Sequence, residues 1–226
     1  MAILYIVATP IGNLEDISKR ALRILSEVDL ILAEDTRVTR KLLSRYQINK
    51  PLISYHQHSR LQKIDHILEL LKKGKNLALV SDAGTPGISD PGNLLIEKIV
   101  QEPVEGVKIV SIPGPSALTA GVSLSGFPMD RFLFLGFPPA KKKRKKFFQG
   151  VISSQYPVVF YESCYRIMKT LEELKLVKTD EIIRVVVCQE LTKMFETTYR
   201  GRLEEVMVQM EGKDLRGEFI VIVFHQ

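Results

Sequence analysis

The chain has 226 residues, of which 45% are hydrophobic and 26% are charged, and its formal net charge at pH 7 is +6. This balance is typical of a globular protein with a buried core and argues against an intrinsically disordered chain. The apolar runs are shorter than the roughly 18 residues that a membrane span needs. No basic leader precedes the first apolar stretch, so we expect a cytoplasmic protein.

The first half of the chain alternates short apolar runs with amphipathic helical patterns. The apolar runs predict strands at residues 4–7, 30–32, 52–55, 77–80 and 107–110. The helical patterns predict helices at residues 17–28, 37–46, 61–71, 93–101 and 116–125. Short apolar strands that alternate with such helices predict a parallel sheet covered on both faces.

The second half follows the hinge-like segment Gly126-Phe127-Pro128 and begins at Phe132. Its predicted strands are FLFLGF, PVVFYE, IIRVVVCQE, FETTYRG and GEFIVIVF, and its predicted helices lie near residues 165–174 and 202–210. Two strands follow one another almost directly across residues 191–193, so this sheet is expected to be mixed. The sequence therefore predicts an α/β protein with an N-terminal domain at 1–125 and a C-terminal domain at 126–226.

The basic residues are concentrated in one run, KKKRKK, which comprises Lys141, Lys142, Lys143, Arg144, Lys145 and Lys146. These six charges equal the whole net charge of the chain. The preceding segment GFPPA, with Pro138 and Pro139, prevents a helix or strand from continuing into the run, so we expect a flexible arm. Such a cluster is typical of nucleic-acid binding. A solvated loop of no special purpose, or an import signal, is the alternative.

Polar segments rich in glycine and proline follow the predicted strands of the first half: ATPIGN, AEDTR, HQHS, SDAGTPGISDPG and PGPSA. In open α/β sheets, ligands bind beyond the carboxyl ends of the strands. The segment at 81–92 combines glycines that allow close approach, prolines that hold the loop, and aspartates that accept hydrogen bonds from an ammonium group. The pattern favours a site for a zwitterionic small molecule, although ordinary turn chemistry explains any single loop.

The two cysteines, Cys164 and Cys188, are far apart and lack the spacing of a metal site. We therefore expect buried free thiols, no disulfide and no bound metal.

The segments ATPIGNLEDI, AEDTR, SDAGTPGISDPG, IPGPSA, FLFLGF, FYES, ELTK and GEF occur in this order along essentially the whole chain. Together they resemble the ribosomal RNA small subunit methyltransferase I family, part of the tetrapyrrole-methylase-like group of S-adenosylmethionine enzymes. The resemblance implies a two-domain homodimer that binds S-adenosylmethionine in a cleft between its domains. It also implies methylation of a cytidine ribose 2′-hydroxyl in small-subunit ribosomal RNA, either free or in the assembled subunit.

The resemblance also implies which residues surround the cofactor. Pro10 borders it, Asp82, Gly84 and Thr85 cradle its methionine part, and Ser116 and Ala117 lie beside it. From the second domain, Tyr161, Leu191 and Glu218 enclose the adenosine. For each position a structural turn or core role is the alternative.

Methyl transfer to a ribose hydroxyl is an in-line displacement, so alignment supplies much of the rate and a positioned base adds to it. The candidate bases are Glu34, Asp35 and Glu190, while Arg37 and Lys193 are suited to holding RNA phosphate or stabilising charge. For Glu34 and Asp35 the alternative is a helix N-cap or a carboxylate in the first turn.

The chain departs from the family pattern in three places. It has FYESCYR where relatives commonly have FYESPHR, and YHQHS at 55–59 where many have YHEHN; His56 and His58 are expected to be structural or to face RNA rather than a metal. It ends at Gln226 without the C-terminal segment of many members.

Two other functions remain open. A methyltransferase acting on a tetrapyrrole or another small molecule would leave KKKRKK without a purpose, and a noncatalytic RNA-binding protein would leave the 81–92 segment without one.

Overall fold

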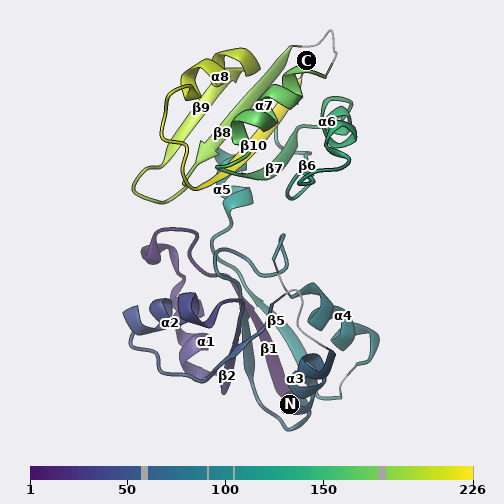
Figure 1. Cartoon of the computed structure of the whole chain (residues 1–226). Coiled ribbons are helices and arrows are strands. Elements are labelled where there is room, and N and C mark those ends of the chain that lie inside the picture. The colour runs from purple at the N-terminus through teal and green to yellow at the C-terminus, as the bar shows by residue number, and fades with distance from the viewer. Residues whose placement is uncertain (57–60, 91, 104, 178–181, 226) are drawn as a thin grey trace. The chain divides into compact units, whose positions relative to one another are not determined.

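The computed structural model describes residues 1–225 except 57–60, 91, 104 and 178–181. The chain divides into two compact units, Met1–Ser116 and Ala117–Gln226 (Figure 1). This division precedes the helix at 117–124, whereas the boundary expected from the sequence follows it. Gln57, His58 and Ser59 of the YHQHS segment lie outside the described residues. Among the described residues, no helix has the length and apolar character that a membrane span requires.

The first unit contains a five-stranded sheet in the order β3-β2-β4-β1-β5. Its strands are β1 (Ala2–Val7), β2 (Leu30–Ala33), β3 (Leu52–Ser54), β4 (Leu77–Val80) and β5 (Val107–Ile112). Every pair of neighbours is parallel. The structure thus confirms the predicted parallel sheet and all five of its strands.

Helices cover both faces of this sheet, as the sequence predicts (Figure 1). They are α1 (Lys19–Glu27), α2 (Thr36–Arg45), α3 (Leu61–Lys72) and α4 (Asn93–Gln101), and a short 3₁₀ turn, η1 (Leu14–Asp16), precedes α1. One buried cluster joins α1 and α2 to Val80 of β4, and another joins α3 and α4 to Leu79 of the same strand. The helix that follows β4 therefore lies on one face of the sheet, and the helices that follow its neighbours β1 and β2 lie on the other face.

The second unit contains a five-stranded sheet in the order β6-β7-β10-β8-β9. Its strands are β6 (Leu133–Phe134), β7 (Val158–Ser163), β8 (Ile183–Gln189), β9 (Thr197–Arg202) and β10 (Glu218–His225). The pair β6 and β7 is parallel and the other neighbours are antiparallel, which confirms the predicted mixed sheet.

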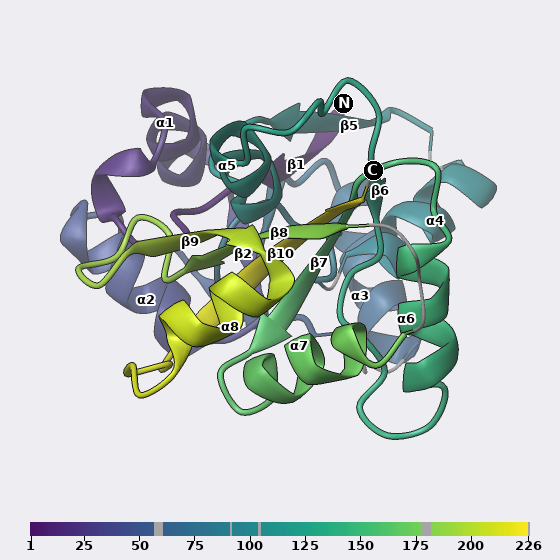
Figure 2. The same ribbon diagram turned by 90° about the horizontal axis from the view of Figure 1, so that it is seen from above.

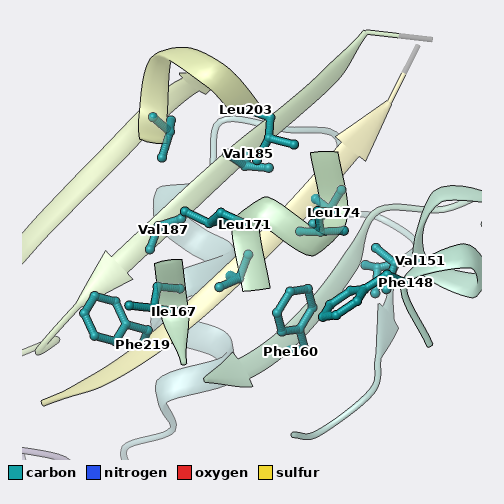
Figure 3. Close-up of a cluster of buried hydrophobic side chains, with 14 of the residues drawn as sticks. Phe148, Val151, Phe160, Ile167, Leu171, Leu174, Val185, Val187, Leu203 and Phe219 are labelled. Carbon is teal, nitrogen blue, oxygen red and sulfur yellow. The ribbon is translucent and has the colours of Figure 1, made fainter. Parts of the chain in front are cut away.

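The helices of the second unit are α5 (Ala117–Leu124), α6 (Arg144–Ile152), α7 (Ile167–Lys175) and α8 (Leu203–Met210). The helix α6 is not predicted by the sequence pattern. Apolar side chains of α6, α7 and α8 pack on one face of the sheet, where the rings of Phe148 and Phe160 lie together (Figure 3). On the other face α5 lies against β10 (Figure 2). A Cβ added to Gly121 of α5 would lie 3.0 Å from the Ile220 side chain. This close packing explains why α5 belongs to the second unit.

Both cysteines are free. Cys188 is buried in β8, as expected, whereas Cys164 is partly exposed.

Candidate functional site

The loop at 81–92 is bound to the loop that follows β1. Thr9 and Gly84 exchange two backbone hydrogen bonds, with N···O distances of 2.9 and 3.0 Å. The buried hydroxyl of Thr9 also donates to the carbonyl oxygen of Ser81 at 3.1 Å. Pro10, which follows Thr9 directly, is buried. Sequence reasoning missed Thr9, although a threonine two residues after a buried strand is a signal for such a contact.

The same loop also contacts the loops after β2 and β5. The carboxylate of Asp82 accepts a hydrogen bond from the backbone N–H of Asp35 at 2.9 Å. The hydroxyl of Thr85 donates to the carbonyl oxygen of Pro115 at 3.1 Å, directly before Ser116, the last residue of the first unit. One loop therefore connects the carboxyl ends of four strands, and it contains three of the predicted cofactor residues.

The glycines of this loop are required by its own packing. Gly84 has a φ of +86°, and a Cβ there would lie 3.3 Å from Ile11. Gly87 has a φ of +85°, and a Cβ there would lie 2.7 Å from the amide oxygen of Asn93, whose Nδ2 donates to the Gly87 carbonyl at 3.2 Å. Residues other than glycine rarely adopt a positive φ, so the backbone conformation of the loop itself requires glycine at both positions.

The three carboxylates at these strand ends have different environments. Asp35 is the N-cap of α2 and accepts from the backbone N–H of Arg37 at 2.8 Å. Hydrogen bonds from the Arg37 side chain and backbone lower the pKa of Asp35 to about 2. Partial burial raises the pKa of Glu34, and the nearby charge of Asp82 adds to that effect. Partial burial also raises the pKa of Asp82, although the hydrogen bond from Asp35 opposes it. The N-cap alternative is thus correct for Asp35.

In the second unit, three predicted residues form one charged group after β8. Glu190 Oε1 accepts from Lys193 Nζ at 2.7 Å and from the backbone N–H of Glu218 at 3.1 Å. The Lys193 ammonium is also 3.5 Å from Glu218 Oε2. Partial burial lowers the pKa of Lys193, but the hydrogen bond from Lys193 to Glu190 and the charge of Glu218 outweigh it and raise the pKa. Leu191, in the same turn, is buried.

The backbone of this turn is unusual, because Glu190 and Thr192 have φ values of +53° and +65°. Non-glycine residues adopt this conformation at a cost. The hydrogen bonds of the Glu190 carboxylate hold the turn, so Glu190 has a structural role here.

Tyr161 of β7 belongs to an aromatic group in the second unit. Its ring centroid lies 5.0 Å from that of Phe134 and 5.4 Å from that of Phe137. The remaining predicted cofactor residue, Ala117, is the first residue of α5.

The basic run is not the flexible arm that the sequence suggested. Lys141 lies in a bend, Lys142 and Lys143 form a turn, and α6 begins at Arg144. The Arg144 side chain is only 7% exposed, because its guanidinium pairs with Glu173 at 2.6 Å and donates to the Pro139 carbonyl at 2.9 Å. The expectation of a displayed arginine is therefore wrong. The lysines remain exposed: Lys141, Lys142, Lys143, Lys145 and Lys146.

Glu162 of β7 is a further charged residue that sequence reasoning missed. Its side chain is fully buried between two arginines. A charged residue within the apolar strand VVFYES was the available signal.

Similarity to known proteins extends over the whole chain. The family described as Tetrapyrrole (Corrin/Porphyrin) Methylases matches residues 3–207. Two relatives named Ribosomal RNA small subunit methyltransferase I come from Thermotoga maritima and Mycoplasmopsis pulmonis. The first is 45% identical and the second 43%, and each match covers 99% of this chain and 98% of the relative. The crystal structure of the methyltransferase CobJ has the same fold, with a TM-score of 0.68 at 19% identity over 98% of this chain and 92% of that one. These matches confirm the resemblance, and the chain belongs to the ribosomal RNA small subunit methyltransferase I family of tetrapyrrole methylases.

Proposed function

We propose that this protein transfers a methyl group from S-adenosylmethionine to the 2′-hydroxyl of a cytidine ribose in small-subunit ribosomal RNA. The observation that carries the proposal is the 45% identity, over almost the full length of both chains, with a protein named Ribosomal RNA small subunit methyltransferase I. Identity of this extent makes a shared reaction the simplest account.

The loops of the first unit fit the cofactor chemically. S-adenosylmethionine carries a positively charged ammonium and sulfonium, and the half-buried carboxylate of Glu34 lies close enough to the more exposed carboxylate of Asp82 for that charge to raise the pKa of Glu34. The contacts of Thr9 with Gly84 and of Thr85 with Pro115 hold the first part of the 81–92 loop against its neighbours, which lowers the entropic cost of binding. In this proposal the cofactor is held by Pro10, Asp82, Gly84, Thr85, Ser116, Ala117, Tyr161, Leu191 and Glu218.

When bound, S-adenosylmethionine supplies an electrophilic methyl group, and the chain must hold the ribose hydroxyl in line and accept its proton. Of the three candidate bases, Glu34 is the most suitable, because a raised pKa makes a carboxylate a stronger base near neutral pH. Asp35 is a weaker base because its pKa is lowered to about 2. Glu190 is already engaged by Lys193 and by the backbone of Glu218.

Arg37 and Lys193 are the proposed positioning groups. The Arg37 side chain is 86% exposed even though it pairs with Asp35, so a phosphate can approach it. Lys193 is held by two carboxylates and stays charged.

Five exposed lysines at 141–146 favour RNA over a tetrapyrrole as the acceptor, because a row of lysines matches the regular charges of a nucleic-acid backbone. Homodimer formation stays a prediction from the family.

The test supplies labelled S-adenosylmethionine together with one of three acceptors: unmodified small subunits, large subunits, or a tetrapyrrole. We expect label only in the small-subunit RNA. Label in the tetrapyrrole alone would favour the second candidate function, and absence of cofactor binding in calorimetry would favour the third, a noncatalytic RNA-binding protein.

A further inference from the structure

Glu162 lies at the centre of a buried charged network in the second unit. Its side chain is 0% exposed. One carboxylate oxygen is 2.7 Å from Arg166 Nη2 and accepts from the backbone N–H of Ser163 at 2.9 Å, and the other accepts from the Thr170 hydroxyl at 2.7 Å. The guanidinium of Arg144 lies 3.8 Å away. A buried carboxylate is costly unless it is paired and hydrogen-bonded in this way, so its partners are held firmly in place.

The two arginines that pair with Glu162 also bind the backbone of residues 138–139, which precede the lysines. Arg144 donates to the carbonyl oxygen of Pro139 at 2.9 Å, and Arg166 donates to that of Pro138 at 3.4 Å. Arg144 also donates to Thr170 at 2.8 Å. The backbone at 138–139 is therefore attached to the network from two sides.

Arg144 also joins the first turn of α6 to the hydrophobic core. Its guanidinium lies 5.1 Å from the centre of the Phe148 ring, and Phe148 packs against Phe160 in the core (Figure 3). Helix α6 is thus fixed at its start by the charged network and one turn later by an aromatic contact.

The local sequence opposes a helix that begins at this point. The N-cap is Lys143, which has a φ of +68° and makes no side-chain cap hydrogen bond. Lys145 and Lys146 stand in the first turn, where the helix dipole disfavours positive charge. Repulsion between neighbouring lysines adds to this cost. The tertiary contacts of Arg144 therefore determine where α6 begins.

We infer that Glu162 and Arg144 are positioning residues, which hold the five lysines of 141–146 as a preformed surface for the phosphates of an RNA backbone. This inference rests on the proposed function. Arg144 contributes by its buried contacts rather than by binding phosphate, so the run contains five phosphate-binding side chains and one anchor. A preformed surface avoids the entropic cost of ordering a flexible arm when RNA binds.

The test is Glu162→Gln, because it separates positioning from simple electrostatics by the sign of the effect. The substitution removes a negative charge, so long-range electrostatics alone would leave binding to a small-subunit RNA fragment unchanged or strengthen it. Loss of the positioned lysines would instead weaken binding about tenfold, the scale of losing a few phosphate contacts. Glu172→Gln is the matched control, since Glu172 is an exposed residue of α7 that carries the same charge.

Hydrogen exchange of the free protein is measured on the same variants. We expect faster exchange at residues 141–148 in Glu162→Gln and no change in Glu172→Gln. Equal RNA affinity and equal exchange in the two variants would overturn the inference.

Arg144→Lys provides a second variant if Glu162→Gln does not fold. It keeps the charge but loses the planar group that donates to several partners at once. We expect weaker RNA binding and faster exchange at 141–148, whereas retained affinity would show that residue 144 acts only through its charge. If the unaltered protein does not bind RNA, the proposed function fails. Hydrogen exchange at residues 141–148 then still shows whether Glu162 and Arg144 hold the lysine segment in place.

Discussion

The carboxylate of Asp82 accepts a hydrogen bond from the backbone N–H of Asp35, with 2.9 Å between Oδ1 and the nitrogen. The two residues follow the neighbouring strands β4 and β2. The contact therefore fixes the start of the 81–92 loop against the N-terminal end of α2, at the edge of the sheet where α/β proteins bind ligands. Within the part of the chain that the structure describes, this bond occupies Oδ1 of Asp82 and leaves Oδ2 available to a cation.

Asp82→Asn is expected to weaken S-adenosylmethionine binding while the fold is retained. The amide keeps an oxygen that can accept from Asp35 but loses the charge that attracts the ammonium group. A hydrogen bond to a charged group contributes about 1.5–3 kcal/mol, so the Kd measured by calorimetry should rise on the order of tenfold or more. Asp65→Asn on the exposed side of α3 is the control. An unchanged Kd with a normal circular dichroism spectrum would show that Asp82 does not bind the cofactor.

Glu34→Gln is expected to reduce the rate of methyl transfer by about 10²- to 10⁴-fold with little change in cofactor affinity. For the unaltered protein, the rate should fall as the pH drops through the raised pKa of Glu34, because only the ionised carboxylate accepts a proton. A rate that does not respond to the substitution would exclude Glu34 as the base.

The same raised pKa predicts how stability depends on pH. The folded state binds the Glu34 proton more tightly than the unfolded state, whose pKa is near the ordinary value of 4.5. The unaltered protein should therefore lose stability relative to Glu34→Gln as the pH rises through the folded-state pKa. Thermal unfolding of both proteins across that range measures the difference, and parallel curves would contradict it.

Replacing the five lysines of 141–146 by serine while Arg144 is kept should weaken RNA binding and flatten its salt dependence. Each lost phosphate contact reduces the slope of log K against log salt by about 0.7–0.9. Cofactor affinity should stay unchanged. Binding measured at several salt concentrations gives the slope, and a slope equal to that of the unaltered protein would mean that the lysines do not touch RNA.

Gly217→Ala should destabilise the protein more than Gly212→Ala does. Both glycines have positive φ, +93° and +68°, which costs an alanine about 1–2 kcal/mol. Only at Gly217 would the new Cβ overlap the carboxylate of Glu190, while nothing lies within 4 Å of it at Gly212. Displacing that carboxylate adds an overpacking cost of about 1–3 kcal/mol. Equal free energies of unfolding for the two variants would show that Glu190 moves aside freely.

The sequence predicts both sheets because their signals are local. Short apolar runs identify β1 to β5, and the run around Cys188 identifies β8. The predicted strand at 132–137 is mostly irregular in the structure and only Leu133–Phe134 is a regular strand. Gly136 adopts a φ of +62°, which a hydrophobic pattern does not reveal.

The features that the sequence does not predict depend on contacts between distant residues. Arg144 can be buried because its guanidinium forms ion pairs with Glu162 and Glu173, and Glu173 is 29 positions away in the sequence. Without knowledge of those two carboxylates, a run of six basic residues predicts that all six side chains are exposed to solvent. The strand-end residues were easier to predict, since Asp82 and Asp35 each lie two residues after the end of an apolar run, but the hydrogen bond between them requires the strand order β2-β4.

The most direct test of the proposed function is to locate the methyl group. Small subunits that lack the modification are incubated with the protein and S-adenosylmethionine, and the RNA is digested to nucleosides and analysed by mass spectrometry. Our account predicts 2′-O-methylcytidine, formed at one position and absent when Glu34→Gln and Asp82→Asn are combined. A methyl group on a base, or no methylated nucleoside from a protein that binds the cofactor, would contradict it.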